Sequence, residues 1–300
     1  MTAAYTAAPA LTGTRVADYL ELTRPRLCVM ALLTVAAGAV LASGSTPDWR
    51  VITHALVGSA LVGAGASALN QWLEREVDAR MRRTRDRPLP AGRLQPGEVL
   101  VLGIASAMGG VIYLAVTLTS PLAAVLAALT FLTYVFVYTP LKRLTSLNTL
   151  VGAIPGALPP VIGWTAVRGS VGAEAGALFA VLFLWQVPHF LAIAWIHRED
   201  YDRAGLCMLP SVDSEGSATG RQMMVYCLAL VAASLMPVVV GGAGPVYLAG
   251  ALLLGIGFLA YAVGFSLRRT TERARGVLRA SLIELPALLA LWLLDGIPHG

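Results

Sequence analysis

Apolar stretches of about twenty residues recur along this chain, and they restrict its fold more than any other feature of the sequence. A helix needs about twenty apolar residues to cross roughly 30 Å of hydrocarbon. Two stretches are interrupted, the fifth by Pro155, Pro159 and Pro160 and the ninth by Glu284 and Pro286. Prolines are tolerated in bilayer helices because neighbouring helices cover the carbonyls that they free. We predict nine transmembrane helices, at residues 27–44, 51–73, 97–118, 121–139, 146–167, 174–196, 222–241, 244–267 and 277–295.

The composition excludes the common alternatives to a membrane protein. Hydrophobic residues make up 57% of the chain and charged residues 13%, whereas soluble domains are about a quarter charged. So few charges cannot coat a soluble globule, and so apolar a chain is not intrinsically disordered. Cys28, Cys207 and Cys227 lie far apart and form neither a disulfide framework nor a CxxC metal site. The expected fold class is an all-α integral membrane protein.

The basic residues lie almost entirely on one side of the predicted spans. Of the 22 lysines and arginines, only Arg50 and Arg168 fall on the other side. Basic loops stay in the cytoplasm, so we expect the N-terminus inside and the C-terminus outside. The net charge of +5 then reflects topology rather than a nucleic-acid partner. Residues 1–14 show no secretory signal, and we expect a disordered tail over 1–20 and one membrane domain over 21–300.

Three oxygen-bearing side chains share one helix face where the second span ends. Asn70, Glu74 and Asp78 are spaced four residues apart, and each step of four advances only about 40° around a helix. Asn70 lies where the span should still be apolar, and a polar group at that depth is costly unless it has a function. Mg²⁺ binds such ligands, usually through one or two carboxylates together with substrate phosphates. The alternative, that these side chains only solvate the helix end, does not account for Asn70.

Arginines follow this acidic face. Arg80, Arg83 and Arg87 are roughly helically spaced, and planar guanidinium groups suit phosphate oxygens. Acid on one flank and base on the other is the arrangement that a metal–diphosphate complex requires. A role in topology alone is equally open for Arg82, Arg85 and Arg93.

A second cytoplasmic loop, after the sixth span, has the same character. The acid-rich run 199–202 stands between Arg198 and Arg203 at the end of an apolar helix. Lys142 and Arg143 occupy a short loop on the same side of the predicted membrane. We therefore expect three cytoplasmic loops to converge over one polar cavity.

The motifs together resemble a known family. The run Asn-x3-Glu-x3-Asp, followed by Arg-Thr-Arg-Asp-Arg-Pro-Leu-Pro-Ala-Gly-Arg, is similar to the first aspartate-rich motif of the UbiA-type intramembrane prenyltransferases. Within that family the match is best to the branch of protohaem IX farnesyltransferases. The other stretches that match in register are 138–148, 152–164, 188–190 and 198–210.

This resemblance implies a fold and a reaction. The fold would be a nine-helix bundle with a lateral active-site cavity capped by cytoplasmic loops, in a bacterial plasma membrane. Farnesyl diphosphate would donate its farnesyl group to the 2-vinyl group of protohaem IX (haem B), and water addition would leave hydroxyethylfarnesyl haem (haem O). The substrates and the lipid bilayer are the expected partners, with haem A synthase or oxidase assembly proteins as further candidates. Haem would be substrate rather than cofactor.

The resemblance also makes Mg²⁺ the expected cofactor. Asn70, Glu74 and Asp78 would bind a first ion, and Asp200 would assist a second ion or the diphosphate. The family usually has aspartate where this chain has Glu74, and the added methylene shifts the carboxylate. Ala204 replaces the later aspartate of the second motif. The haem branch shares this second departure, which favours haem over a quinone precursor as acceptor.

Further residues take roles in substrate binding through the same resemblance. Lys142 completes the catalytic set. His189, a polar ring within the sixth span, would face the haem as an iron ligand or a propionate contact; a structural histidine that donates to a backbone carbonyl is equally open. The other residues expected to contact substrate are Arg83, Arg87, Tyr138, Arg143 and Arg198.

Three competing functions are weighed against this one. A UbiA-type enzyme that prenylates a quinone precursor or another aromatic acceptor would share the donor site and differ only in the acceptor. A transporter or channel would place polar residues near the middle of several spans, whereas the charges here gather at one membrane face, with Glu284 as the main exception. A structural assembly factor would not need the acidic faces.

Overall fold

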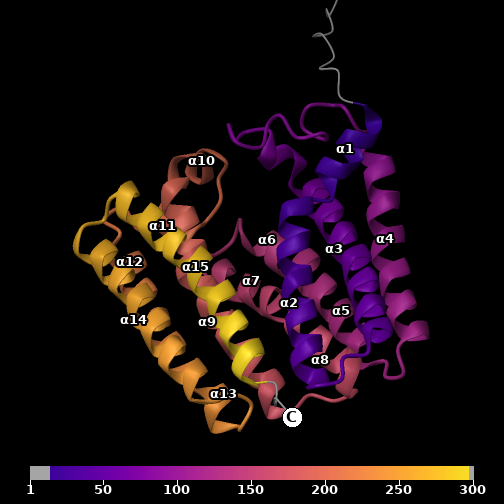
Figure 1. The fold of residues 1–300 in the computed structure, drawn as a ribbon. Helices are drawn as coiled ribbons and strands as arrows, with labels where there is room; N and C mark the ends of the chain where they lie inside the picture. The colour runs from indigo at the N-terminus through magenta and orange to yellow at the C-terminus, as the bar shows by residue number, and fades with distance from the viewer. Residues whose placement is uncertain (1–13, 297–300) are drawn as a thin grey trace, which may run out of the picture.

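The computed structural model describes residues 14–296, and every regular element in that range is a helix (Figure 1). Within these residues, nine helical segments are long and apolar enough to cross a membrane, as predicted. They are α2 (Pro25–Ser43), α3 (Trp49–Asp78), α4 (Pro96–Thr117), α5–η1–α6 (Leu122–Leu141), α7–α8 (Asn148–Arg168), α9 (Ala173–Ile196), α12–α13 (Ser217–Val239), α14 (Pro245–Leu267) and α15 (Thr271–Gly296).

Several helices extend beyond the predicted apolar limits. Helix α3 continues to Asp78 rather than ending at residue 73, and α15 begins at Thr271 rather than at residue 277. The extra turns are polar, because a hydropathy pattern marks the hydrocarbon layer and not the point where helical hydrogen bonding stops. The extension of α3 keeps its acidic residues on a continuous helix.

The two segments with prolines behave differently. The fifth is divided at Leu158 into α7 (Asn148–Ala157) and α8 (Pro159–Arg168). Pro159 and Pro160 have no backbone N–H, so two successive rungs of the helical ladder are missing. Helix α15 continues through its single Pro286, and the ninth span is therefore one helix.

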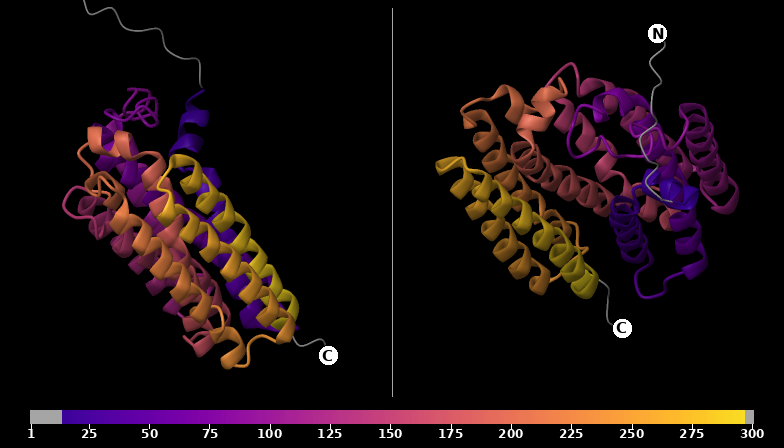
Figure 2. Two further views of the ribbon diagram at one scale, coloured as in Figure 1. Left: turned by 90° about the vertical axis from the view of Figure 1, so that its left-hand side faces the viewer. Right: turned by 90° about the horizontal axis from the view of Figure 1, so that it is seen from above.

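The bundle consists of two groups of helices that lie side by side (Figures 1 and 2). In the N-terminal group, α3 packs along α4 and α2 packs along α8; in the C-terminal group, α9, α12, α14 and α15 pack on one another. Glycines permit the close approach of α2 and α8: a Cβ on Gly163 would lie 1.9 Å from the Val35 carbonyl oxygen. Helix α7 packs against α9 and joins the two groups.

The start of the described chain corrects one prediction. Residues 1–13 lie outside the described range, but Arg15–Leu22, part of which was expected to be a disordered tail, forms helix α1. Asp18 of this helix accepts a hydrogen bond from Arg93 at 2.6 Å, and the Leu22 carbonyl accepts one from Gln71 at 2.6 Å. These contacts with residues far away in the sequence stabilise a short helix that the local sequence does not predict.

Candidate active site

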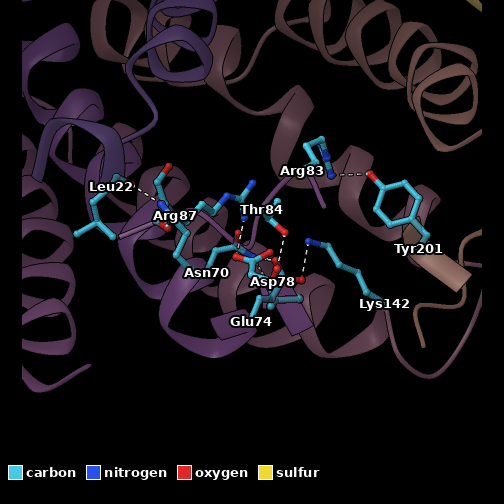
Figure 3. A network of polar contacts seen from close by, with 12 residues as sticks. Leu22, Asn70, Glu74, Asp78, Arg83, Thr84, Arg87, Lys142 and Tyr201 are labelled. Carbon is cyan, nitrogen blue, oxygen red and sulfur yellow. Dashed lines mark hydrogen bonds and ion pairs between the residues drawn. The ribbon is translucent and has the colours of Figure 1, made fainter. Parts of the chain in front are cut away.

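The predicted acidic face is present on the last turns of α3. Asn70, Glu74 and Asp78 are all buried, and they lie close together in Figure 3. The Asn70 amide nitrogen donates to Glu74 Oε2 and to Thr139 Oγ1, each at 3.0 Å. Glu74 and Asp78 line a cavity, whereas Asn70 is fully enclosed behind them. The helix thus presents two carboxylates, and the asparagine orients the first of them.

Each carboxylate is paired with one cation. Lys142 Nζ lies 2.9 Å from Glu74 Oε1, and Arg87 Nη1 lies 2.6 Å from Asp78 Oδ2. Burial disfavours the charged lysine, but the Glu74 carboxylate, together with Tyr138 and Tyr134, outweighs this effect and raises the pKa of Lys142 above the ordinary value. Burial, together with the nearby Arg24, lowers the pKa of Arg87. A lysine whose pKa is raised stays protonated at neutral pH, so Lys142 is a fixed positive charge.

A π-helical turn brings aromatic residues to the same place. Segment η1 (Thr133–Tyr138) interrupts the span between α5 (Leu122–Leu132) and α6 (Thr139–Leu141). Thr139 Oγ1 donates to the Tyr134 carbonyl at 2.9 Å, which satisfies a backbone group in the widened turn. Lys142 Nζ lies 4.5 Å from the centroid of the Tyr138 ring, a cation–π distance. Such turns are frequent at functional sites.

The cavity between the two groups of helices has a volume of about 810 Å³, within the roughly 300–1,000 Å³ that is typical of small-molecule sites. Its polar end holds Glu74, Asp78 and several cations, and its remaining wall is mostly apolar. The cations that line it are Arg24, Arg26, Arg83, Arg87 and Lys142, and the apolar residues include Leu27, Leu32, Val35, Phe131, Phe190 and Ile193.

Small residues on α3 leave room for this cavity. Ser59, Gly63 and Ser67 recur every four residues, a spacing that usually indicates close packing of membrane helices. All three line the cavity instead, and a Cβ on Gly63 would meet only the Cys28 sulfur, at 3.6 Å. This face of α3 is therefore open where the pattern predicts a helix contact.

The three predicted loops converge over the polar end. Arg83, in the loop after α3, donates to the Tyr201 hydroxyl at 3.2 Å, and Tyr201 belongs to α10 (Arg198–Arg203). The Cys207 backbone N–H donates to the Lys142 carbonyl at 2.7 Å. Arg83 and Tyr201 face each other across the site in Figure 3. The residues after Asp78 form turns rather than a helix, and Arg80 is exposed.

Two oxygens in the acidic cluster have no partner within the described residues. Asn70 Oδ1 and Asp78 Oδ1 are buried and accept no hydrogen bond, which is costly unless a cation or a donor reaches them. No group of three or more His, Cys, Asp or Glu side chains that could hold a metal occurs in residues 14–296. A cation here would depend on the Asn70 amide oxygen and on phosphate oxygens besides the two carboxylates, a donor set that suits Mg²⁺.

The comparisons with known proteins agree with this geometry. Residues 31–283 match the UbiA prenyltransferase family. The chain belongs to the UbiA prenyltransferase family. It is 46% identical over 289 residues to a protein from Solibacter usitatus (strain Ellin6076) named protoheme IX farnesyltransferase, covering 93% of this chain and 98% of that one. A protein of the same name from Salinibacter ruber (strain DSM 13855 / M31) is 44% identical over 282 residues, covering 93% and 98%.

Solved structures show that the fold is that of UbiA-family membrane proteins. A digeranylgeranylglyceryl phosphate synthase superposes with a TM-score of 0.80 at 18% identity, covering 94% of this chain and 99% of that one. A UbiA homologue from Archaeoglobus fulgidus, bound to DMAPP and Mg²⁺, superposes with a TM-score of 0.62 at 16% identity, covering 92% and 99%. The predicted UbiA-type bundle is confirmed, with nine candidate membrane spans in residues 14–296.

Besides the enclosed Asn70, four residues with predicted site roles do not line the cavity of this UbiA-family protein. Asp200 pairs with Arg203 at 2.8 Å, and Arg143 is exposed. Arg198 lies over the Trp195 ring, 4.7 Å from its centroid. His189 Nδ1 hydrogen-bonds the Ser281 hydroxyl at 2.8 Å between α9 and α15. Their roles in the reaction stay predictions.

Arg24 is among the cavity residues that the sequence argument missed. Arg24, which counted there only as a topology determinant, lines the cavity and has a buried Nε without a partner. Its φ of 49° is rare for a residue with a side chain. Pro25, the first residue of α2, follows it directly, and an arginine fixed before a proline at the start of a span is the signal that could have drawn attention to it.

Proposed function

We propose that this protein transfers the farnesyl group of farnesyl diphosphate to the 2-vinyl group of protohaem IX, with hydration, to give haem O. Relatives that cover 93% of the chain at 41–46% identity carry the name protoheme IX farnesyltransferase. The observation that carries the proposal is the cavity itself: two buried carboxylates and five cations stand at one end of a largely apolar chamber. A diphosphate ester with a long hydrocarbon tail likewise has a charged end and an apolar part.

The polar end suits departure of the diphosphate. The carboxylates that now pair with Lys142 and Arg87 would exchange these cations for a metal ion, and the two cations would then contact diphosphate oxygens. Charge that develops on the leaving group is stabilised by cations held in place before the reaction. Arg24 and Arg83 line the same end and add to this stabilisation.

The apolar part suits the carbocation-like farnesyl group. Apolar residues of α2, η1 and α9 form much of its wall, and such a lining would disfavour water beside an intermediate that water would quench. The rings of Tyr134 and Tyr138 also line the cavity, with centroids 5.5 Å apart. Their π faces would stabilise positive charge close to Lys142, whose Nζ lies 4.5 Å from the centroid of the Tyr138 ring.

Mg²⁺ is the cofactor that we propose. Glu74 and Asp78 would hold it with Asn70, because Asn70 Oδ1 and Asp78 Oδ1 are buried without partners. Bound between these residues and the diphosphate, the ion would neutralise the leaving group as a Lewis acid. Removal of Mg²⁺ with a chelator should therefore abolish turnover, and Mg²⁺ or Mn²⁺ should restore it.

The membrane setting is also part of the proposal. We place the protein in the bacterial plasma membrane with the loops over the cavity in the cytoplasm, because the basic residues gather on that side. The two ends of the described chain lie at opposite ends of the bundle (Figure 1), which fits an odd number of spans. The product would pass to haem A synthase or to oxidase assembly proteins.

A substrate comparison tests the proposed function. Purified protein in detergent is incubated with farnesyl diphosphate, Mg²⁺ and either haem B or 4-hydroxybenzoate. The products are separated by reversed-phase chromatography and identified by mass spectrometry. Haem B should yield a later-eluting haem that is heavier by one farnesyl group and one hydroxyl group. Prenylated 4-hydroxybenzoate with no farnesylated haem would contradict the proposal and indicate a quinone-type acceptor.

A further inference from the structure

One amide in the apolar part of the cavity has a carbonyl without a partner. Gln186 of α9 lines the cavity and is 4% exposed. Its Nε2 donates to the Leu182 carbonyl at 3.0 Å and to the Ala153 carbonyl at 3.4 Å, so both amide protons are used and the amide orientation is fixed. Oε1 accepts no hydrogen bond within the described residues, and it is not among the enclosed polar atoms. It is therefore an acceptor open to the cavity.

A glycine makes the space for this carbonyl. A Cβ on Gly156 of α7 would lie 1.9 Å from Gln186 Oε1, a distance at which the amide would have to move. Gly156 also lines the cavity. The two helices lie side by side in Figure 1, and they contact each other along this line. Any larger residue at position 156 would displace the oxygen.

Contacts place Gln186 just beneath the reacting end. Lys142, which pairs with Glu74, covers the Tyr138 ring, and that ring in turn touches α7 at Gly152, where a Cβ would lie 2.5 Å from it. Gly156 is one helical turn, about 5 Å, farther along α7. Gln186 Oε1 thus lies one turn below the ring that borders the diphosphate end, where the acceptor would meet the farnesyl group.

We infer that Gln186 is a positioning residue that holds the water molecule used in the hydration step. This inference rests on the proposed function. A single water in an apolar chamber needs polar partners to remain there. The Gln186 carbonyl supplies one of them, a fixed acceptor that leaves the oxygen lone pairs of that water free to attack. A glutamine is neutral, so it orients water without adding a charge that would attract bulk solvent.

The step balances without a further reagent. When the farnesyl carbon bonds to the terminal vinyl carbon, the vinyl π pair is used and a cation remains on the carbon attached to the porphyrin. The water held by Gln186 donates a lone pair to that carbon, which forms the C–O bond. The proton that this water loses passes to the diphosphate released in the first step. Without a held water the same cation loses a neighbouring proton to the diphosphate, and the product is an alkene lighter by one water.

The mass of the product tests the inference. Gln186→Met keeps a side chain of similar length but removes the acceptor, and Gly156→Ala displaces it. With farnesyl diphosphate, Mg²⁺ and haem B, both variants should form more of the lighter alkene and less of the hydrated haem. We expect the ratio of hydrated to unhydrated product to fall about tenfold, as loss of one hydrogen bond implies. A ratio does not depend on how much of the variant is folded.

A matched variant separates the alternatives. Gln71→Met makes the same change at another amide that lines the cavity, and its hydrated fraction should equal that of the wild type. An unchanged ratio in both Gln186→Met and Gly156→Ala would overturn the inference while the proposed function stands. Absence of any farnesylated haem from the wild type would instead remove the proposed function.

Discussion

The two acidic segments, 70–78 and 199–202, look alike in the sequence and differ in the structure. Each stands at the end of an apolar helix among arginines, one ending α3 and the other forming α10. In the first, Glu74 and Asp78 are buried and line the cavity. In the second, Asp200 pairs with Arg203 of its own helix, and Asp202 is exposed.

The difference lies in where the counter-charge comes from. Glu74 takes its cation from another span, at Lys142, and Asp78 takes its cation from the loop, at Arg87. Asp200 takes its cation from three residues away, and the Arg203 side chain is 43% exposed. Exposed pairs are worth little, whereas buried carboxylates are maintained only where other elements satisfy them. Burial, rather than acidity, therefore distinguishes the candidate catalytic segment.

Asp78→Asn should give the largest effect. Loss of one carboxylate from the cluster should lower kcat for farnesyl transfer by roughly 10²–10³-fold, in the range of a lost electrostatic contact, and should weaken Mn²⁺ binding measured by electron paramagnetic resonance. Glu76→Gln is the matched control, because Glu76 is an exposed acid on the same helix end and should change neither readout. Full activity of Asp78→Asn would refute the proposed metal site.

Lys142→Met should give the second-largest loss of activity. It removes the buried cation of Glu74, and we expect farnesyl transfer to fall by about 10–10²-fold with a raised KM for farnesyl diphosphate. The neighbouring Arg143 is exposed, so Arg143→Met should change turnover less than about twofold. Equal losses in the two variants would mean that the loop acts through its total charge and not through the Glu74–Lys142 pair.

Asp200→Asn should have a smaller effect than Asp78→Asn. The pair that it breaks is partly exposed and contributes about 0–1 kcal/mol, so we expect turnover to fall by less than about fivefold and the melting temperature in detergent to stay nearly constant. A loss as large as that of Asp78→Asn would show that α10 moves Asp200 to the diphosphate during the reaction, and the contrast between the two segments would then hold only for the free protein.

Arg85→Gln should give the smallest effect. Arg85 is exposed and its ion partner is the adjacent Asp86 at 3.7 Å, whereas Arg87, two residues on, pairs with Asp78. We expect turnover and KM for farnesyl diphosphate to stay within about twofold of the wild type. Arg87→Gln, measured beside it, should raise KM clearly; equal responses would indicate a diffuse basic surface rather than a specific contact at Arg87.

Much of the site could be predicted because it depends on spacing along one helix. Asn70, Glu74 and Asp78 share a face by helical geometry, and the structure places them together. Arg83, Arg87, Tyr138 and Lys142 were expected at the site and do line the cavity. Arg24 could not be ranked above the other basic residues from its spacing, because its place in the cavity wall and the burial of its Nε depend on residues far away in the sequence. His189 could not be placed either, because its hydrogen bond to Ser281 joins residues on distant spans.

By itself the sequence determined the number of spans, the side on which the charges gather and the helix that carries the acids, because each of these is a property of consecutive residues. Tertiary structure decided which charges are buried and which face of each helix is open. Ser59, Gly63 and Ser67 have the spacing of a packing face and line the cavity instead, and Gln186 presents its carbonyl only because α7 places a glycine opposite it. A local pattern fixes the face on which a side chain lies, but only the neighbouring helices determine what that face meets.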